Sequence, residues 1–142
     1  MSKLIKSDLS FKSKNFNFHF IVRDGITIVT GDSSTGKTLF FKLHRLKCLR
    51  YKNNDMIFIN YDNGAELEKL MSDGLNNKIV FVDNADIIVS KTVNMYRSIH
   101  DSNNQFIFFG RDIDRYDKGY DNVAFLTEKN RGNFVLEYLI RG

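Results

Sequence analysis

The sequence predicts an α/β domain with a mainly parallel, doubly wound sheet, and two observations carry this prediction. Short apolar runs alternate with stretches of helical periodicity through the middle of the chain. The apolar runs are continuous, which is typical of strands that are buried on both faces of a sheet. The chain has 142 residues, enough for one domain with its own core, so we expect a single domain over 1–142.

The chain is expected to open with a hairpin. In NFNFHFIV (15–22) the three Phe residues alternate with polar ones, as they do on a half-buried strand. Leu9 and Phe11 come just before it, with KSKN between the two segments. We therefore expect an antiparallel pair of strands at the N-terminal end.

The remaining elements follow from the period of the apolar residues. Runs rich in Ile, Val and Phe read as strands, and longer runs with a spacing of three or four residues read as helices. The last two strands flank the turn EKNRGN and are expected to pair in an antiparallel way. In chain order, the expected strands are 25–30, 56–60, 78–83, 105–110, 123–126 and 134–140, and the expected helices are 37–50, 64–71 and 92–100.

The helix expected over 37–50 is amphipathic. We expect its buried stripe to be made mostly of leucines, while three basic residues lie off the stripe. The stripe residues are Leu39, Phe40, Leu43, Leu46 and Leu49, and the basic residues are Lys42, Arg45 and Lys47.

The segment GDSSTGKT (31–38) matches the pattern G-x-x-x-x-G-K-[ST] between an expected strand and an expected helix, which is the context of a P-loop. Backbone N–H groups at the start of such a helix can bind phosphate oxygens. Lys37 would bridge the β- and γ-phosphates, and the Thr38 hydroxyl would ligate Mg²⁺. A Gly- and Ser-rich turn can match by chance, but with both flanks correct the motif predicts nucleotide binding. The expected nucleotide-binding residues are Gly31, Asp32, Ser33, Ser34, Thr35, Gly36, Lys37, Thr38 and Leu39.

A second motif supports the first. KIVFVD ends in Asp83 after four consecutive apolar residues, and it is similar to a Walker B strand, whose acid holds Mg²⁺ through water. The simpler alternative is an acidic residue that merely ends a buried strand.

With these motifs the chain resembles P-loop NTPases of the additional-strand division, which includes the ABC, AAA+ and recombinase-like ATPases. The resemblance covers about residues 16 to 127. It implies a three-layer fold with strand order 5-1-4-3-2, counting 25–30 as the first strand. QFIFFGRD matches the additional strand by position, and Arg111 at its polar end could then sense the γ-phosphate. The chain lacks an LSGGQ-type signature, a helical lid after the core and an N-K-x-D motif. A complete ABC ATPase, a complete AAA+ motor and guanine specificity are therefore disfavoured, and Mg²⁺ with ATP is the expected ligand.

Asn84 is the largest departure from these relatives, which usually carry Glu directly after the Walker B Asp. Asn can orient the attacking water but cannot accept its proton. Asp86 and Asp62 are alternative bases, although each is more often a loop or capping acid. We therefore expect slow or partner-dependent ATP hydrolysis, with Lys37, Asn84, Asp86 and Arg111 as the candidate catalytic residues.

Three functions stay open from the sequence. The leading one is a Mg·ATP-binding switch or subunit with weak or partner-dependent ATPase activity. The alternatives are a small nucleotide or metabolite kinase, and an interaction module with a vestigial P-loop. Partners expected beside ATP and ADP are a protein partner or a second copy of the chain.

Composition sets the remaining expectations. The formal net charge of +4 suits an anionic ligand, and the basic residues of the 37–50 helix leave nucleic-acid contact open, although a solvated face is the simpler explanation. Cys48 is the only cysteine, so we expect a reducing, cytoplasmic setting. No apolar run approaches the roughly 20 residues of a membrane span.

Overall fold

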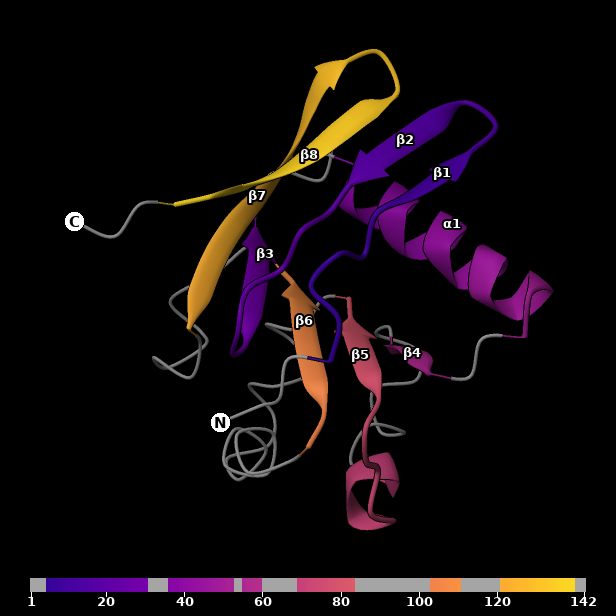
Figure 1. Cartoon of the computed structure of the whole chain (residues 1–142), viewed down its shortest axis with the longest axis vertical. Helices are drawn as coiled ribbons and strands as arrows, with labels where there is room; N and C mark the ends of the chain where they lie inside the picture. Colours follow the sequence, from indigo (N-terminus) through magenta and orange to yellow (C-terminus); the bar gives the residue numbers. More distant parts are fainter. Residues whose placement is uncertain are drawn as a thin grey trace.

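The computed structural model describes residues 5–30, 36–52, 55–59, 69–83, 103–110 and 121–139. These residues form one eight-stranded sheet, and a helix lies across one of its faces (Figure 1). The strand order is β1-β2-β8-β7-β3-β6-β5-β4. The strands are β1 (Phe11–Ser13), β2 (Phe16–His19), β3 (Thr27–Thr30), β4 (Met56–Ile59), β5 (Ile79–Val82), β6 (Gln105–Phe109), β7 (Asn122–Asn130) and β8 (Asn133–Tyr138), and the helix is α1 (Lys37–Arg50).

Five strands, from β7 to β4, run parallel. β3 lies at the centre, with Val29 paired to Phe109 of β6 and to Ala124 of β7. Every residue of β3, β5 and β6 is buried. A strand at the centre of a parallel sheet is covered on both faces, and this is why its sequence is continuously apolar.

The observed sheet has eight strands, so its full order differs from the expected five-strand order 5-1-4-3-2. Within it, the five parallel strands from β7 to β4 do follow that order, because β3, β4, β5, β6 and β7 are the first to fifth expected strands. Three more strands continue the sheet beyond β7. The two terminal hairpins form as antiparallel pairs, β1 with β2 and β7 with β8, but β2 also pairs in parallel with β8. Local patterns predicted the hairpins but not this pairing, because it joins segments from opposite ends of the chain.

Each face of the parallel strands has its own core. On the face that α1 covers, Val29, Phe81 and Phe109 pack with α1 and with the N-terminal hairpin. On the other face, residues such as Ile28 and Phe108 pack together with apolar side chains from 69–75. Successive residues of one strand belong to opposite cores because side chains alternate along a strand. Residues 69–72 are helical, in agreement with the end of the helix expected over 64–71. The rest of that helix, and the whole of the one expected over 92–100, lie outside the described residues.

The bounds of α1 agree with the expected helix, but its predicted buried face is wrong. Phe40 is fully buried, whereas Leu46 is 53% exposed and Leu49 is 66% exposed. Leu39 and Leu43 are only partly buried. The face that packs on the sheet consists of Lys37, Phe40, Phe41, His44 and Cys48. The helix carries two apolar stripes. The stripe that packs on the sheet is the one whose aromatic rings fill the space above β5 and β6.

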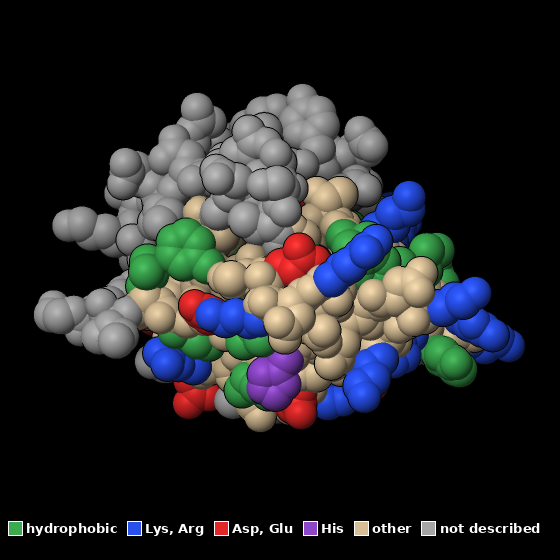
Figure 2. All heavy atoms as spheres, turned by 90° about the horizontal axis from the view of Figure 1, so that it is seen from above, with side chains coloured by type: hydrophobic (Ala, Val, Ile, Leu, Met, Phe, Trp, Pro, Cys, Tyr) green, Lys and Arg blue, Asp and Glu red, His purple; other side chains and the backbone are tan. Residues whose placement is uncertain are grey.

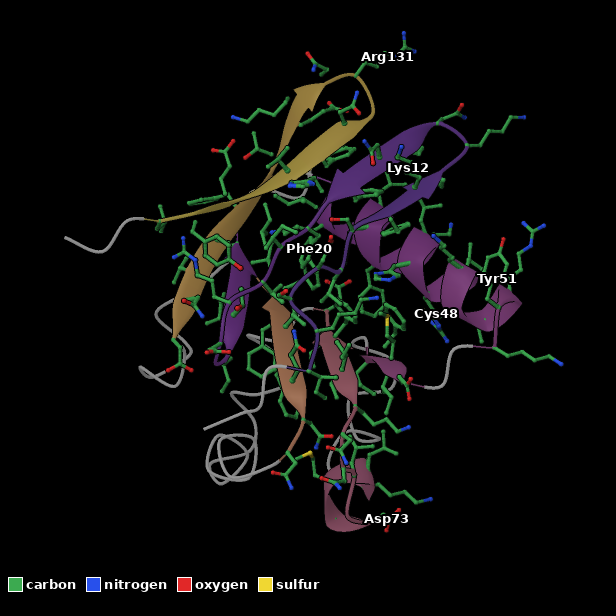
Figure 3. The ribbon with its side chains drawn as sticks, in the orientation of Figure 1. Lys12, Phe20, Cys48, Tyr51, Asp73 and Arg131 are labelled. Carbon is green, nitrogen blue, oxygen red and sulfur yellow. The ribbon has the colours of Figure 1, made fainter. Side chains whose placement is uncertain are left out.

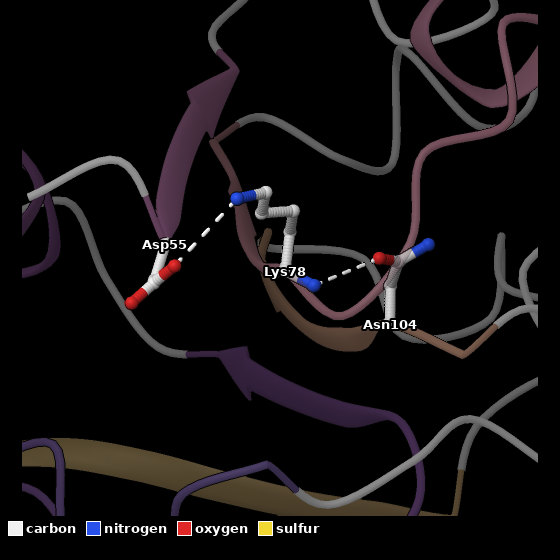
Figure 4. A network of polar contacts seen from close by, with 3 residues as sticks. All are labelled: Asp55, Lys78 and Asn104. Atoms are coloured by element: carbon white, nitrogen blue, oxygen red, sulfur yellow. Dashed lines mark hydrogen bonds and ion pairs between the residues drawn. The ribbon is translucent and has the colours of Figure 1, made fainter.

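Polar contacts hold the starts of the parallel strands together (Figure 4). The Lys78 backbone N–H donates to Asn104 Oδ1 at 3.0 Å, and Lys78 Nζ lies 3.6 Å from Asp55 Oδ1. Asp55 is largely exposed, so this ion pair adds at most about 1 kcal/mol. Gln105 is buried, and its Oε1 accepts hydrogen bonds from the backbone of Ile5 and Lys6. These contacts lie at the sheet edge opposite the candidate site and serve the fold.

Among the described residues, no helix has the length and apolar character that crossing a membrane requires.

Candidate nucleotide-binding site

The candidate site lies at the carboxyl ends of the parallel strands. β3 ends at Thr30 and α1 begins at Lys37, so residues 31–36 of the motif form the connection between them. β5 and β6 run parallel to β3 and end at the same edge of the sheet. Open α/β sheets bind ligands at this edge. The structure thus brings the end of the P-loop motif and the residues that follow β5 and β6 to one side of the molecule.

Among the described residues, no side-chain hydrogen bond caps the N-terminus of α1. Gly36 is the N-cap residue in a left-handed conformation, with φ 92° and ψ 5°, and the first turn holds no acidic residue. The first helical hydrogen bond runs from the Phe40 N–H to the Gly36 carbonyl at 2.8 Å. The dipole of a helix makes its N-terminus favourable for an anion. The start of α1 therefore has the polarity that a phosphate group requires.

Three predicted nucleotide-binding residues form the first turn of α1. Lys37 is only 6% exposed, Thr38 is exposed, and Leu39 is partly buried. The exposed Thr38 hydroxyl is accessible to a ligand at the same helix end.

Gly36 also has a structural reason to be glycine. A Cβ atom built at this position would come within 2.4 Å of Phe134 Cε1, and its φ of 92° already disfavours other residues. Phe134 belongs to β8 and stacks on Phe18 of β2, with 4.9 Å between ring centroids. Phe134 of the C-terminal hairpin therefore lies directly against Gly36, and Phe18 of the N-terminal hairpin supports the Phe134 ring from behind. Sequence reasoning missed Phe134, because nothing local to the 134–140 strand marks its contact with Gly36.

Asp83 directly follows β5, and β6 separates β5 from β3. With neighbouring strands about 4.8 Å apart, the ends of β3 and β5 lie roughly 10 Å from each other. The Asp83 N–H donates to the Ile59 carbonyl at 2.7 Å, which continues the β4–β5 ladder beyond the strand. Between them, Gly110 follows β6, and its N–H donates to the Val29 carbonyl at 3.1 Å. Asp83 is half-buried at the edge where α1 begins.

The other predicted site residues lie outside the described residues. These are Gly31, Asp32, Ser33, Ser34 and Thr35 of the motif, and the candidate catalytic residues Asn84, Asp86 and Arg111. Asp62 lies outside them as well. Within the described ranges, no group of three or more His, Cys, Asp or Glu side chains is placed to hold a metal ion.

Comparisons with known proteins add a distant likeness in structure. No protein-family model matches the chain, and no curated protein matches it. One solved structure with a similar chain is the genome packaging NTPase B204 from Sulfolobus turreted icosahedral virus 2, in complex with ATP-gammaS. It is 14% identical, the match covers 75% of this chain and 76% of that chain, and the TM-score is 0.43. A likeness of this extent says nothing about function, so the proposal below rests on the residues of this chain.

Proposed function

We propose that this protein binds Mg·ATP at the carboxyl edge of its parallel sheet and hydrolyses it slowly, or only with a partner, as a switch or subunit. One observation carries the proposal: the G-x-x-x-x-G-K-T motif spans the junction between the buried central strand β3 and the N-terminus of α1, whose N-cap residue is Gly36. The position of Asp83, one strand beyond β6 at the same edge, supports it.

Each residue has a proposed role. Lys37 contacts the β- and γ-phosphates, and backbone N–H groups from about Ser34 to Thr38 surround the β-phosphate. The Thr38 hydroxyl ligates Mg²⁺, and Asp83 holds the ion through a water molecule. Asn84 orients the attacking water but cannot remove its proton, which accounts for slow hydrolysis.

Thermal unfolding with and without Mg·ATP tests the binding step. At about 100 times its dissociation constant, a ligand that binds only the folded state stabilises it by about 2.7 kcal/mol. We expect this ligand-dependent shift in wild type and its loss in Lys37→Ala. Lys42→Ala is the matched control, because Lys42 is exposed on the same helix. Each variant is compared with itself without nucleotide, so any loss of stability from replacing the buried Lys37 cancels.

The results separate the three functions that the sequence leaves open. If Mg·ATP does not shift the thermal unfolding of wild type, the protein is better explained as an interaction module with a vestigial P-loop. If the shift persists in Lys37→Ala, ATP binds at another site.

If Mg·ATP binds, the rate of phosphate release from Mg·ATP measures its hydrolysis. A rate that rises faster than protein concentration indicates a group supplied by a second copy, whereas transfer only to an added acceptor indicates a kinase. Asn84→Glu should raise turnover, and an unchanged rate would remove Asn84 as the cause of slow hydrolysis.

A further inference from the structure

The C-terminal half of α1 lies over two hollows at the edge of the sheet where β4 is the last strand among the described residues. The larger hollow has a volume of about 490 Å³, and the smaller one about 250 Å³. Cys48 and Met56 line both, and their sulfur atoms are 3.6 Å apart. We call the two hollows together the α1–β4 groove. The larger is lined by Arg45, Cys48, Leu49, Lys52, Met56, Ile57 and Phe58, and the smaller by Lys6, Leu9, Ser10, Phe11, His44, Lys47, Cys48, Tyr51 and Met56.

The rim of the groove is strongly basic. Arg45 and Lys52 border the larger hollow, and Lys6 and Lys47 border the smaller one. The segment 37–52 contains no acidic residue. All four rim cations are exposed, and none pairs with a carboxylate within the described ranges. In Figure 2, Lys and Arg side chains are denser on the right of the molecule, the side on which α1 ends in Figure 1, and others lie on the left, where acidic side chains lie beside them.

Apolar surface lies beside this positive charge. Leu46 and Leu49 are exposed on α1, and Tyr51 is 68% exposed just after it. Met56, Ile57 and Phe58 of β4 line the larger hollow together with residues of α1. Among the described residues β4 has a strand partner on one side only, and an edge strand of this kind can pair with an extended chain through its backbone N–H and C=O groups. Figure 3 shows Cys48 on the side of α1 that faces β4 and Tyr51 at the helix end.

We propose that the α1–β4 groove binds an acidic, extended segment of a partner protein. An apolar side chain of the segment enters the larger hollow, its backbone runs along β4, and its carboxylates pair with Arg45 and Lys52. Charge complementarity requires an anionic partner. The apolar residues Leu49, Met56 and Phe58 at the larger hollow favour a peptide side chain over nucleic acid, which would leave the hollow empty. A lipid bilayer is too flat to fill a hollow of about 490 Å³.

Fluorescence anisotropy with a labelled peptide tests the proposal. The probe is a short fluorescein-labelled peptide in which Leu and Phe alternate with Glu, and a second peptide carries Ser in place of Leu and Phe. We expect the first peptide to bind at least about tenfold more tightly than the second, because only the first can fill the hollow. The double variant Arg45→Glu with Lys52→Glu should lower the affinity for the first peptide by about tenfold or more. Leu49→Ala should lower this affinity by a smaller factor, about threefold.

The control is a second double charge reversal of the same size. Lys12→Glu with Arg131→Glu changes the net charge equally, but both residues are exposed on the hairpins, away from Cys48 and Tyr51 (Figure 3). This variant should bind the peptide within about twofold of wild type. If both double variants lose peptide affinity equally, the loss is explained by overall charge, and the proposed binding at the α1–β4 groove is wrong. The proposal is also overturned when wild type does not bind the peptide, or when a single-stranded oligonucleotide or phosphatidylserine vesicles bind more tightly. Lys37→Ala should bind the peptide normally, so this test is independent of nucleotide binding.

Discussion

At the scale of single residues, His44 shows how the core determines a charge state. Its ring lies among four Phe rings, stacked on Phe11 with a centroid distance of 4.4 Å. Its Nδ1 atom is buried without a hydrogen-bond partner. Burial, and then repulsion from Lys47 and Lys6, lowers the pKa of His44 from 6.5 to about 4. The ring therefore stays neutral in the folded protein at neutral pH.

The lowered pKa of His44 predicts that the protein loses stability in mild acid. Below pH 6.5 the unfolded chain takes up a proton at His44, whereas the folded protein does not accept it until about pH 4. The unfolded state thus binds more protons in this window, and the free energy of unfolding falls as the pH falls. Between pH 7 and pH 5 the loss is about 2 kcal/mol. Urea unfolding at the two pH values measures it.

Two variants check that this loss comes from His44. His44→Phe keeps an aromatic ring in the cluster, removes the unpaired nitrogen, and should abolish most of the difference between pH 7 and pH 5. His19→Gln alters an exposed residue of β2 and should keep the wild-type difference. An unchanged pH dependence in His44→Phe would show that other groups cause the acid sensitivity.

At the scale of elements, α1 illustrates how a helix with two apolar stripes is oriented. Phe40 is fully buried and lies 4.3 Å from Phe20 and 5.6 Å from Phe109, measured between ring centroids. Leu46 lies six residues further along the helix and is 53% exposed. Packing with the sheet and the N-terminal hairpin, rather than the spacing of leucines, selects the buried face.

Substitutions on the two stripes should therefore differ sharply in their cost. We expect Phe40→Ala to lower the free energy of unfolding by about 3–5 kcal/mol, because it removes a ring from the core. Leu46→Ala should change it by less than about 0.5 kcal/mol. Urea unfolding compares the two, and Phe40→Leu gives a smaller cost should the alanine variant not fold. Equal costs at positions 40 and 46 would contradict the observed orientation of α1.

At the scale of the whole molecule, a doubly covered parallel sheet is joined to an extension built from the two ends of the chain. β2 and β8 pair in parallel, and the Asn17 N–H donates to the Gly132 carbonyl at 2.7 Å. The extension is also where Phe134 meets Gly36. The extension therefore reaches the last residue of the motif before α1.

Hydrogen exchange should reveal this layered architecture. Amides of β3, β5 and β6 should exchange last, because these strands are fully buried and are paired on both sides. Amides of β1 and β4, the outermost strands of the described sheet, should exchange earlier. Mass spectrometry of peptic fragments distinguishes the two groups. Exchange of β6 as fast as that of β4 would contradict the central position of β6.

The sequence by itself determined the local features of this protein. The bounds of α1, the two hairpins, the buried strands and the position of the motif between β3 and α1 were all predictable. Each depends on residues that are close together in the chain, through a period of 2 or 3.6 residues or through the chemistry of one loop. The parallel succession from β7 to β4 required the resemblance to P-loop NTPases in addition.

Only the tertiary structure decided how distant segments combine. The parallel pairing of β2 with β8, the contact of Phe134 with Gly36, the buried face of α1 and the neutral His44 were not predictable from local patterns. In each case the outcome depends on which surface a segment meets after folding. An apolar stripe or an alternating strand indicates that one face of the element will be buried. Which other segment covers that face depends on packing and strand pairing across the whole chain.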